Sequence, residues 1–242
     1  RFSTLISLIA MSVVVGQGAG SSLLRALMLT GLIILSVLAT FLSSWLLSKT
    51  ALKGKTSSFA LELPPYRRPQ IGKVIVRSVL DRTLFVLGRA AAVAAPAGLV
   101  IWLLANCSVG GQTLLGLICS ALDPFAQLFG IDGVILTALI LSFPANEIFL
   151  PLILMGYLQS AALTEVSLTE LHSLLFSQGW TVWTALAVMV LCLFHWPCST
   201  TLLTIRKETG SLRWCALSAL LPTAIGFLLC GLLQLVRLVA AS

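Results

Sequence analysis

Charged residues are scarce in this chain of 242 residues: they make up 10% of it, whereas hydrophobic residues make up 58%. A typical soluble domain has about 25% charged residues, so this chain has too little polar surface to cover its apolar side chains in water. Several apolar runs approach the ~20 residues that a helix needs to cross a bilayer, and the alternation typical of barrel strands is lacking. The sequence therefore predicts an all-α, polytopic helical membrane protein.

Paired cysteines and enzyme motifs are also lacking. The six cysteines include no CxxC pair, and we expect most of them to be small buried hydrophobic residues. No Ser/His/Asp or metal-hydrolase pattern stands out. Gly54-Lys55-Thr56 resembles the end of a phosphate-binding P-loop, but that motif requires a glycine where the sequence has Lys49. We therefore expect no enzyme active site within these residues.

Basic residues are absent from 90–205, although five acidic residues lie there. By contrast, eight of the fifteen basic residues lie between Lys49 and Arg82. Cytoplasmic loops of membrane proteins are rich in Lys and Arg, so this asymmetry predicts that 48–83 is cytoplasmic and that 105–112 and 159–179 face outward. The net charge of +7 is then explained by basic residues in the cytoplasmic loops. We therefore expect no nucleic-acid partner.

The same patterns divide the chain into three regions. The basic cluster of Arg206, Lys207 and Arg213 is predicted to be cytoplasmic as well. Segment 113–158 either crosses the membrane twice or re-enters from one side, and the sequence leaves both alternatives open. The predicted regions are N-terminal transmembrane helices (1–47), a cytoplasmic basic loop with an amphipathic helix over 71–82 (48–83), and a C-terminal transmembrane bundle (84–242).

Two apolar runs are interrupted by proline and polar residues. The first, GVILTALILSFPANEIFLPLILMGYL, is broken at 143–147, and the second, WTVWTALAVMVLCLFHWPCSTTLLTI, is broken at 195–201. Proline removes a helical hydrogen bond, and lipid cannot satisfy the freed backbone groups, so such breaks are tolerated where they are buried in protein or line a polar cavity. The pattern predicts two discontinuous transmembrane helices, with breaks at Pro144, Pro151 and Pro197. Paired broken helices are typical of a transporter's binding site.

Polar side chains at these breaks are candidate ligands of a cation. Glu147 is the only acidic residue deep in an apolar run, where an ionised group costs about 2.5–3.5 kcal/mol to insert. With Asn146, His195 and Cys198 it offers carboxylate, amide, imidazole and thiolate groups, which suit a borderline divalent transition metal. Two alternatives stay open: a protonated, hydrogen-bonded Glu147, and a packed kink at His195 and Cys198 without a ligand role.

Three motifs, ELPPYRRP, FPANEIFLPLILM and HWPCSTTLLTIRKETGS, resemble the ferrous iron transport protein B family. The resemblance covers the C-terminal part of the family's membrane domain, including its second gate region. It implies that 1–47 contains the end of the first gate region, although MSVVVGQGAGSSLLRAL lacks the Cys and Pro usual there. The functional residues that it implies are Pro144, Asn146 and Glu147 in one motif, and His195, Pro197, Cys198 and Thr200 in the other.

The resemblance also implies a cellular setting. The protein would be a multi-pass protein of a bacterial or archaeal cytoplasmic membrane that moves Fe²⁺, its substrate, inward. GTP and Mg²⁺ would bind only in an N-terminal GTPase domain outside these residues. Since the sequence begins at Arg1, we expect it to be a piece of a longer protein. The expected partners are membrane lipid, the GTPase domain, a small cytoplasmic protein of the same transport system and, as an alternative left open, further copies of the chain.

Three functions compete at this stage. The first is uptake of Fe²⁺ through the two breaks. The second is a carrier of nucleosides or other small organic solutes, with aromatic residues such as Phe143 and Trp196 as stacking partners. The third is a membrane anchor whose segment 48–83 docks on anionic lipid or on a cytoplasmic domain. Substitution of Cys198 separates the first two, because a metal path needs the thiol and a nucleoside site does not.

Overall fold

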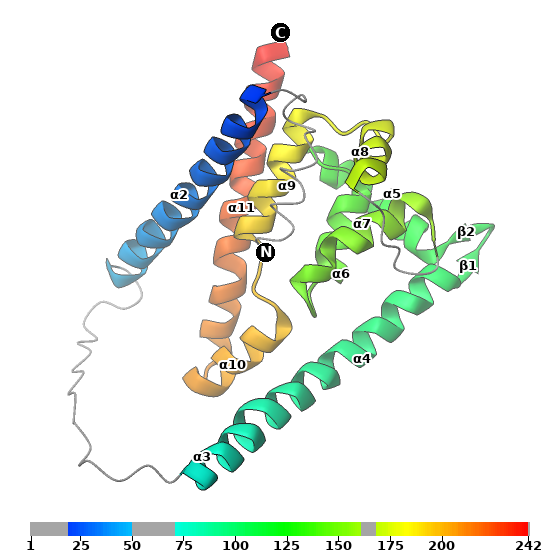
Figure 1. Ribbon diagram of the computed structural model, residues 1–242. Helices are drawn as coiled ribbons and strands as arrows, with labels where there is room; N and C mark the ends of the chain where they lie inside the picture. Colours follow the sequence, from blue (N-terminus) through cyan, green and yellow to red (C-terminus); the bar gives the residue numbers. More distant parts are fainter. Residues whose placement is uncertain (1–18, 50–70, 161–167, 242) are drawn as a thin grey trace. The chain divides into compact units, whose positions relative to one another are not determined.

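The described part of the chain is almost entirely helical (Figure 1). The computed structural model describes residues 19–49, 71–160 and 168–241. The chain divides into two compact units, Ile33–Ala92 and a larger unit formed by the remainder, and each is considered by itself. The helices confirm the predicted all-α class.

The smaller unit includes most of α2 (Ala19–Lys49) and the whole of α3 (Ile71–Ser78). Helix α3 continues without interruption into a π-helical segment, η1 (Val79–Leu84), and then into α4 (Phe85–Asn106). The amphipathic helix predicted over 71–82 is thus the start of a longer helix. Its contact with a membrane surface stays a prediction.

Three of the predicted segments lie partly outside the described residues. These are 1–18, where the end of the first gate region was expected, 50–70 of the basic loop, and 161–167 of the segment expected to face outward. The predictions for these residues stay predictions.

In the larger unit, the chain turns directly after α4. A short antiparallel hairpin of β1 (Ser108–Val109) and β2 (Gln112–Thr113) leads into α5 (Leu114–Gln127). The Thr113 hydroxyl oxygen accepts a hydrogen bond from the Gly116 amide at 3.1 Å. Because the first amides of a helix have no helical acceptor, this cap determines where α5 begins.

Helices α6 (Gly133–Leu141) and α7 (Phe149–Leu158) form an antiparallel hairpin, joined by a turn and a 3-10 helix, η2 (Asn146–Ile148). Their open ends meet, since a Cβ on Gly156 would lie 2.5 Å from Val134 Cγ1. Each helix is only about 15 Å long, half of a ~30 Å bilayer core, so neither can cross a membrane alone.

This hairpin corrects one prediction and favours one of two alternatives. The first interrupted run was expected to continue through its break as one discontinuous helix. The chain instead reverses, because α6 ends before Pro144 and the helix does not resume until η2. For segment 113–158, a run that folds back on itself favours re-entry from one side over two crossings.

The second interrupted run has a different geometry. Helices α9 (Val182–Phe194) and α10 (Ser199–Thr209) lie one after the other along α11 (Leu212–Ala241). The Cys230 thiol of α11 donates to a backbone oxygen of α9 at 3.4 Å, and the Cys215 thiol donates to one of α10 at 3.5 Å. The two helices therefore share one long partner, although residues between them are not helical.

Four stretches of the described chain are helical, long and apolar enough to cross a membrane. Three of them are continuous helices. The fourth contains the interruption between α9 and α10. The four are Ala26–Lys49, Val86–Asn106, Val182–Thr209 and Leu212–Ala240.

The buried core of the larger unit lies among α6, α7, α8 (Leu168–Ser177) and α9. Close helix contact requires small residues at some positions. A Cβ on Gly133 would overlap the backbone oxygen of Cys119, so glycine is required where α6 meets α5. The largest fully buried side chains include Ile135, Leu139, Ile153, Met155, Leu175, Met189 and Leu191.

Candidate functional site

The two predicted interruptions lie against each other in the fold. The Ser199 amide donates a hydrogen bond to the Phe143 carbonyl at 3.0 Å, and the Ser199 hydroxyl donates to the Pro144 carbonyl at 3.4 Å. Both carbonyls belong to the turn after α6, whereas Ser199 is the first residue of α10. Backbone groups freed by one interruption are thus satisfied by the other, as the interior of a membrane demands.

Cys198 directly precedes the first residue of α10. Its Sγ atom lies 3.1 Å from the hydroxyl oxygen of Thr200 and 3.1 Å from that of Thr201. The first amides of a helix lack helical acceptors and carry the positive end of the helix dipole, so a thiolate is stabilised at this position. The fold therefore places a half-buried sulfur donor, with two hydroxyl groups beside it, at the contact between the interruptions.

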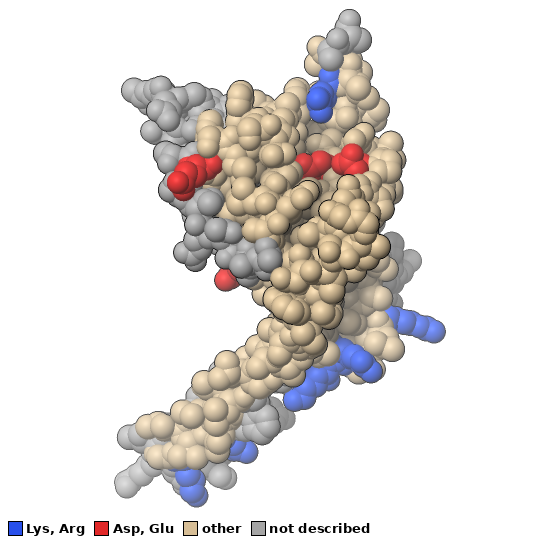
Figure 2. Space-filling view, turned by 90° about the vertical axis from the view of Figure 1, so that its right-hand side faces the viewer, with Lys and Arg blue, Asp and Glu red and all other residues tan. Residues whose placement is uncertain are grey.

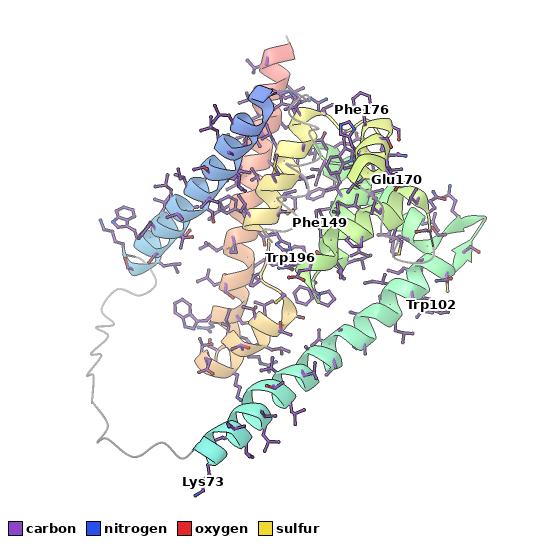
Figure 3. The ribbon with its side chains drawn as sticks, viewed as in Figure 1. Lys73, Trp102, Phe149, Glu170, Phe176 and Trp196 are labelled. Carbon is purple, nitrogen blue, oxygen red and sulfur yellow. The ribbon has the colours of Figure 1, made fainter. Side chains whose placement is uncertain are left out.

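His195 and Trp196 lie in the gap between α9 and α10. The His195 side chain is buried, and its amide donates to the Leu191 carbonyl at 2.8 Å, where α9 ends. The two rings have centroids 5.8 Å apart. Figure 3 shows Trp196 at this junction and Phe149, the first residue of α7, in the same part of the view. Because the backbones of His195 and Cys198 are extended, the two side chains do not share a helical face.

Asn146 and Glu147 lie in η2, at the tip of the α6–α7 hairpin. The Asn146 Oδ1 atom is buried and accepts no hydrogen bond from any described residue. The Glu147 side chain is exposed. A buried oxygen without a donor is costly, which makes Asn146 a candidate acceptor or cation ligand, with the Glu147 carboxylate next to it in the chain.

The three predicted proline breaks have different outcomes. Pro144 lies between α6 and η2, and Pro197 lies between α9 and α10, so both are at interruptions. The predicted break at Pro151 is wrong, because Pro151 is the third residue of α7. In the first turn of a helix the amide has no helical acceptor, so proline is tolerated there.

The candidate ligands do not form a closed metal centre. In the ranges that the structure describes, no three or more His, Cys, Asp or Glu side chains are placed to hold one metal ion together. His195, Cys198 and Glu147 are therefore not a preformed three-ligand site. Separate, weak donors are compatible with passage of an ion, since a tight site would retain it.

Ser199 is a functional candidate that the sequence reasoning missed. A serine has no side-chain chemistry that marks it among neighbouring Ser and Thr residues. Its position in the sequence could have identified it. The residue directly after Pro197-Cys198 is the first residue of the next helix, so its amide lacks a helical acceptor.

A second polar cluster, also missed, lies at the open end of the α6–α7 hairpin. The Tyr157 hydroxyl donates to the Asp132 carboxylate, and Trp180 Nε1 donates to the Tyr157 oxygen at 2.7 Å. Asp132 also caps α6 by accepting from the Ile135 amide at 2.7 Å. Asp132 lies in the loop before α6, outside the four candidate spans, and burial raises the pKa of its carboxyl although the Tyr157 hydrogen bond lowers it.

Two family models match neighbouring parts of the chain. Residues 29–81 match the model described as ferrous iron transport protein B C terminus. Residues 87–212 match the Gate model, described as nucleoside recognition. The second match covers more than half of the chain and includes both interruptions.

Curated relatives named Fe(2+) transporter FeoB are similar over most of the chain. One from Staphylococcus aureus is 29% identical over 213 residues (85% of this chain), and one from Synechocystis sp. is 29% identical over 203 residues (81%). One from Leptospira biflexa is 24% identical over 217 residues (83%). The aligned region spans only 31% of the length of each of these relatives. No solved structure matches the chain.

Proposed function

Because this chain belongs to the ferrous iron transport protein B family, of which it carries the C-terminal membrane region with the Gate domain, we propose that it forms part of the route by which Fe²⁺ crosses a bacterial membrane. The route passes the contact between the α6–α7 tip and the α9–α10 junction. The observation that carries this proposal is the hydrogen bond from Ser199 to Phe143, which joins the two interruptions.

In this proposal α9 and α10 act as one discontinuous transmembrane helix. Its interruption leaves the start of α10 exposed to the route, and the helix dipole there disfavours a cation. Cys198 offsets this effect as a thiolate, because a negative sulfur at the helix start is stabilised by the dipole and attracts Fe²⁺. The transient ligands are Asn146, Glu147, His195, Cys198 and Thr200.

The rest of the transporter lies outside these residues, since the chain spans about a third of its relatives' length. We assign GTP and Mg²⁺ binding to an N-terminal GTPase domain in that remainder. The basic segment 48–83 then faces the cytoplasm, where it meets that domain or anionic lipid. A small cytoplasmic protein of the transport system and further copies of the chain complete the proposed partners.

A nucleoside carrier is the second candidate, and the description of the Gate model as nucleoside recognition favours it. Phe143 and Trp196 offer aromatic faces for a base, and Asn146 Oδ1 offers an acceptor. This function does not need the sulfur of Cys198, so it predicts normal transport by a Cys198→Ser variant.

Uptake of radiolabelled Fe²⁺ tests the first proposal in iron-transport-deficient bacteria that express the full-length transporter. Cys198→Ser removes the soft donor and Glu147→Gln removes the charge, so we expect uptake to fall at least ~10-fold in each, equivalent to ~1.4 kcal/mol or more. Cys107→Ser and Glu208→Gln are matched controls, because both side chains are exposed and lie outside the interruptions.

Membrane levels of every variant are matched by immunoblot before uptake is compared. Loss in the two site variants and normal uptake in both controls supports the route through the interruptions. Normal uptake in Cys198→Ser and Glu147→Gln contradicts it. Radiolabelled uridine uptake in the same cells tests the nucleoside alternative, which requires transport of uridine that is independent of Cys198.

A further inference from the structure

A polar cavity of about 340 Å³ lies at the end of the larger unit where α9 begins and α11 ends. Figure 1 shows these two helix ends side by side. The cavity is separate from the interruptions, because its lining includes no residue of 143–147 or 195–201, and it plays no part in the proposed iron route. Its polar lining consists of Gln127, Asp132, Gln178, Trp180, Thr184, Gln234 and Arg237.

Asp132 is held in one orientation within this lining. One carboxylate oxygen accepts from the Ile135 amide at 2.7 Å, and the other accepts from the Tyr157 hydroxyl. Tyr157 is itself oriented by Trp180 Nε1 at 2.7 Å. Each carboxylate oxygen can accept more than one hydrogen bond, so Asp132 remains able to accept from a ligand in the cavity.

Arg237 lines the same cavity with a full positive charge. It forms no ion pair within the described ranges, with Asp132 or with any other acidic residue. Its neighbours in the lining include the amides of Gln178 and Gln234, which donate as well as accept. The cavity is thus lined by an oriented carboxyl group, that of Asp132, and by the guanidinium of Arg237, and the two do not form an ion pair with each other.

The wall of the cavity is shaped at Gly130. Its φ of +74° belongs to the left-handed region that glycine adopts readily, and a Cβ there would lie 2.7 Å from Gln234 Oε1. A side chain at position 130 would therefore displace Gln234 from the lining.

The depth of the cavity indicates what occupies it. Arg237 lies near the end of the candidate span Leu212–Ala240, where basic side chains of membrane helices reach the lipid headgroups. Figure 2 shows acidic groups in the upper half of the view and a basic group above them. Opposite charges that line one cavity suit a ligand that carries both charges, as a zwitterionic phospholipid does.

We propose that this cavity binds the headgroup of phosphatidylethanolamine. The phosphodiester accepts hydrogen bonds from the Arg237 guanidinium and from the Gln178 and Gln234 amides. The primary ammonium donates to Asp132. Phosphatidylcholine has the same net charge but no N–H donor, and phosphatidylglycerol has no cation, so neither satisfies both ends of the cavity.

Native mass spectrometry of the full-length transporter tests this. The protein is taken from bilayers with equal parts of phosphatidylethanolamine, phosphatidylcholine and phosphatidylglycerol, and the bound lipids are counted. We expect one retained phosphatidylethanolamine, and Arg237→Gln reduces its retention about 10-fold because a charged hydrogen-bond donor is lost. Arg213→Gln is the matched control, at the other end of the same helix.

Asp132→Asn is the second variant, and Asn is as good a helix cap as Asp, so α6 keeps its start. We expect this variant to retain phosphatidylethanolamine no better than phosphatidylcholine. Asp123→Asn is its control, since Asp123 also accepts a backbone amide, that of Gly133 at 2.8 Å, but does not line the cavity. Thermal unfolding in detergent verifies that all four variants are folded.

Three outcomes would overturn the proposal. Equal retention of the three lipids would show that the protein does not select the phosphatidylethanolamine headgroup. Equal retention of phosphatidylethanolamine by Arg237→Gln and Arg213→Gln would show that the cavity does not bind the lipid. Retention of soluble glycerophosphoethanolamine in place of the lipid shows a small-molecule site instead. None of these readouts depends on iron transport.

Discussion

Gly156 shows how one residue controls the α6–α7 hairpin. It lies at the open end of the hairpin, and a single added carbon would come within 2.5 Å of Val134 Cγ1. At the same end of α6, Gly133 allows the backbone of Cys119 to come close. Without a hydrophobic force between helices in lipid, such close contacts supply much of the packing. The two glycines therefore allow the close packing of the open end of the hairpin, at the opposite end from the candidate site at its tip.

Gly156→Ala is expected to lower the free energy of unfolding by about 1–3 kcal/mol, because the added methyl group overpacks the contact with Val134. Thermal or denaturant unfolding of the purified transporter in detergent measures the change. The double variant Gly156→Ala with Val134→Ala should recover part of the loss, since the smaller side chain makes room.

Gly231→Ala in α11 is the control for helix propensity, because a Cβ there would meet no described atom within 4 Å apart from its chain neighbours and the backbone of its own helix. It should be neutral or more stable by up to about 1 kcal/mol. Equal effects of Ala at positions 156 and 231 would show that Val134 does not press on Gly156.

Helix α10 is the element that joins the two interruptions. Its first residue, Ser199, donates a hydrogen bond to Phe143 in the other interruption. Cys198, before it, has φ −60° and ψ 157°, the extended conformation that a residue before proline adopts. Proline is favoured as the first residue of a helix, so a proline at position 199 can keep α10 intact. It removes the Ser199 amide proton, which binds the Phe143 carbonyl. A proline at position 199 can thus remove the contact between the two interruptions and still leave α10 folded.

Ser199→Pro is expected to reduce Fe²⁺ uptake more strongly than Ser199→Ala, which removes only the longer hydrogen bond from the hydroxyl to Pro144. The loss of a hydrogen bond that leaves its partner unsatisfied away from water costs about 1–3 kcal/mol. Uptake and thermal unfolding are measured in parallel at matched membrane levels.

Val182→Pro is the control, since Val182 is the first residue of α9 and follows Thr181 in an extended conformation. It introduces the same residue at the same helical position without touching the site. If Val182→Pro and Ser199→Pro behave alike, the contact between the interruptions has no special role.

At the scale of the molecule, the membrane orientation combines the charge pattern with the hairpin. The basic residues Arg206 and Arg213 flank the start of α11, and this favours a cytoplasmic position there. The hairpin opens at the other end of α11, because Tyr157 contacts Trp180 just before α9. The open end of the α6–α7 hairpin, where the chain enters α6 and leaves α7, should then face outward.

Cysteine labelling from each side of the membrane tests this orientation. In a variant without native cysteines, Leu128→Cys and Leu158→Cys should both react with an impermeant maleimide from outside, because both side chains are exposed and flank the open end. Thr209→Cys, at the end of α10, should react only from the cytoplasmic side. Labelling of positions 128 and 158 from opposite sides would contradict re-entry.

The sequence by itself determined the membrane class, the long spans and the positions where helices stop. These follow from local causes: the length of the apolar runs, the scarcity of charged residues, and proline at positions 144 and 197. Pro151 was misassigned for an equally local reason, since proline interrupts a helix in its interior but not in its first turn. The polar residues of the candidate site were identifiable because polar groups are rare in apolar runs.

Only the tertiary structure decided how the interruptions meet. The same kind of break reverses the chain between α6 and α7, whereas α9 and α10 continue along α11 because both pack on one long helix. The sequence pattern is alike in the two cases, and the difference comes from contacts between distant residues. The hydrogen bonds from Ser199 to Phe143 and Pro144, and the cluster of Asp132, Tyr157 and Trp180, likewise join residues that no local pattern relates.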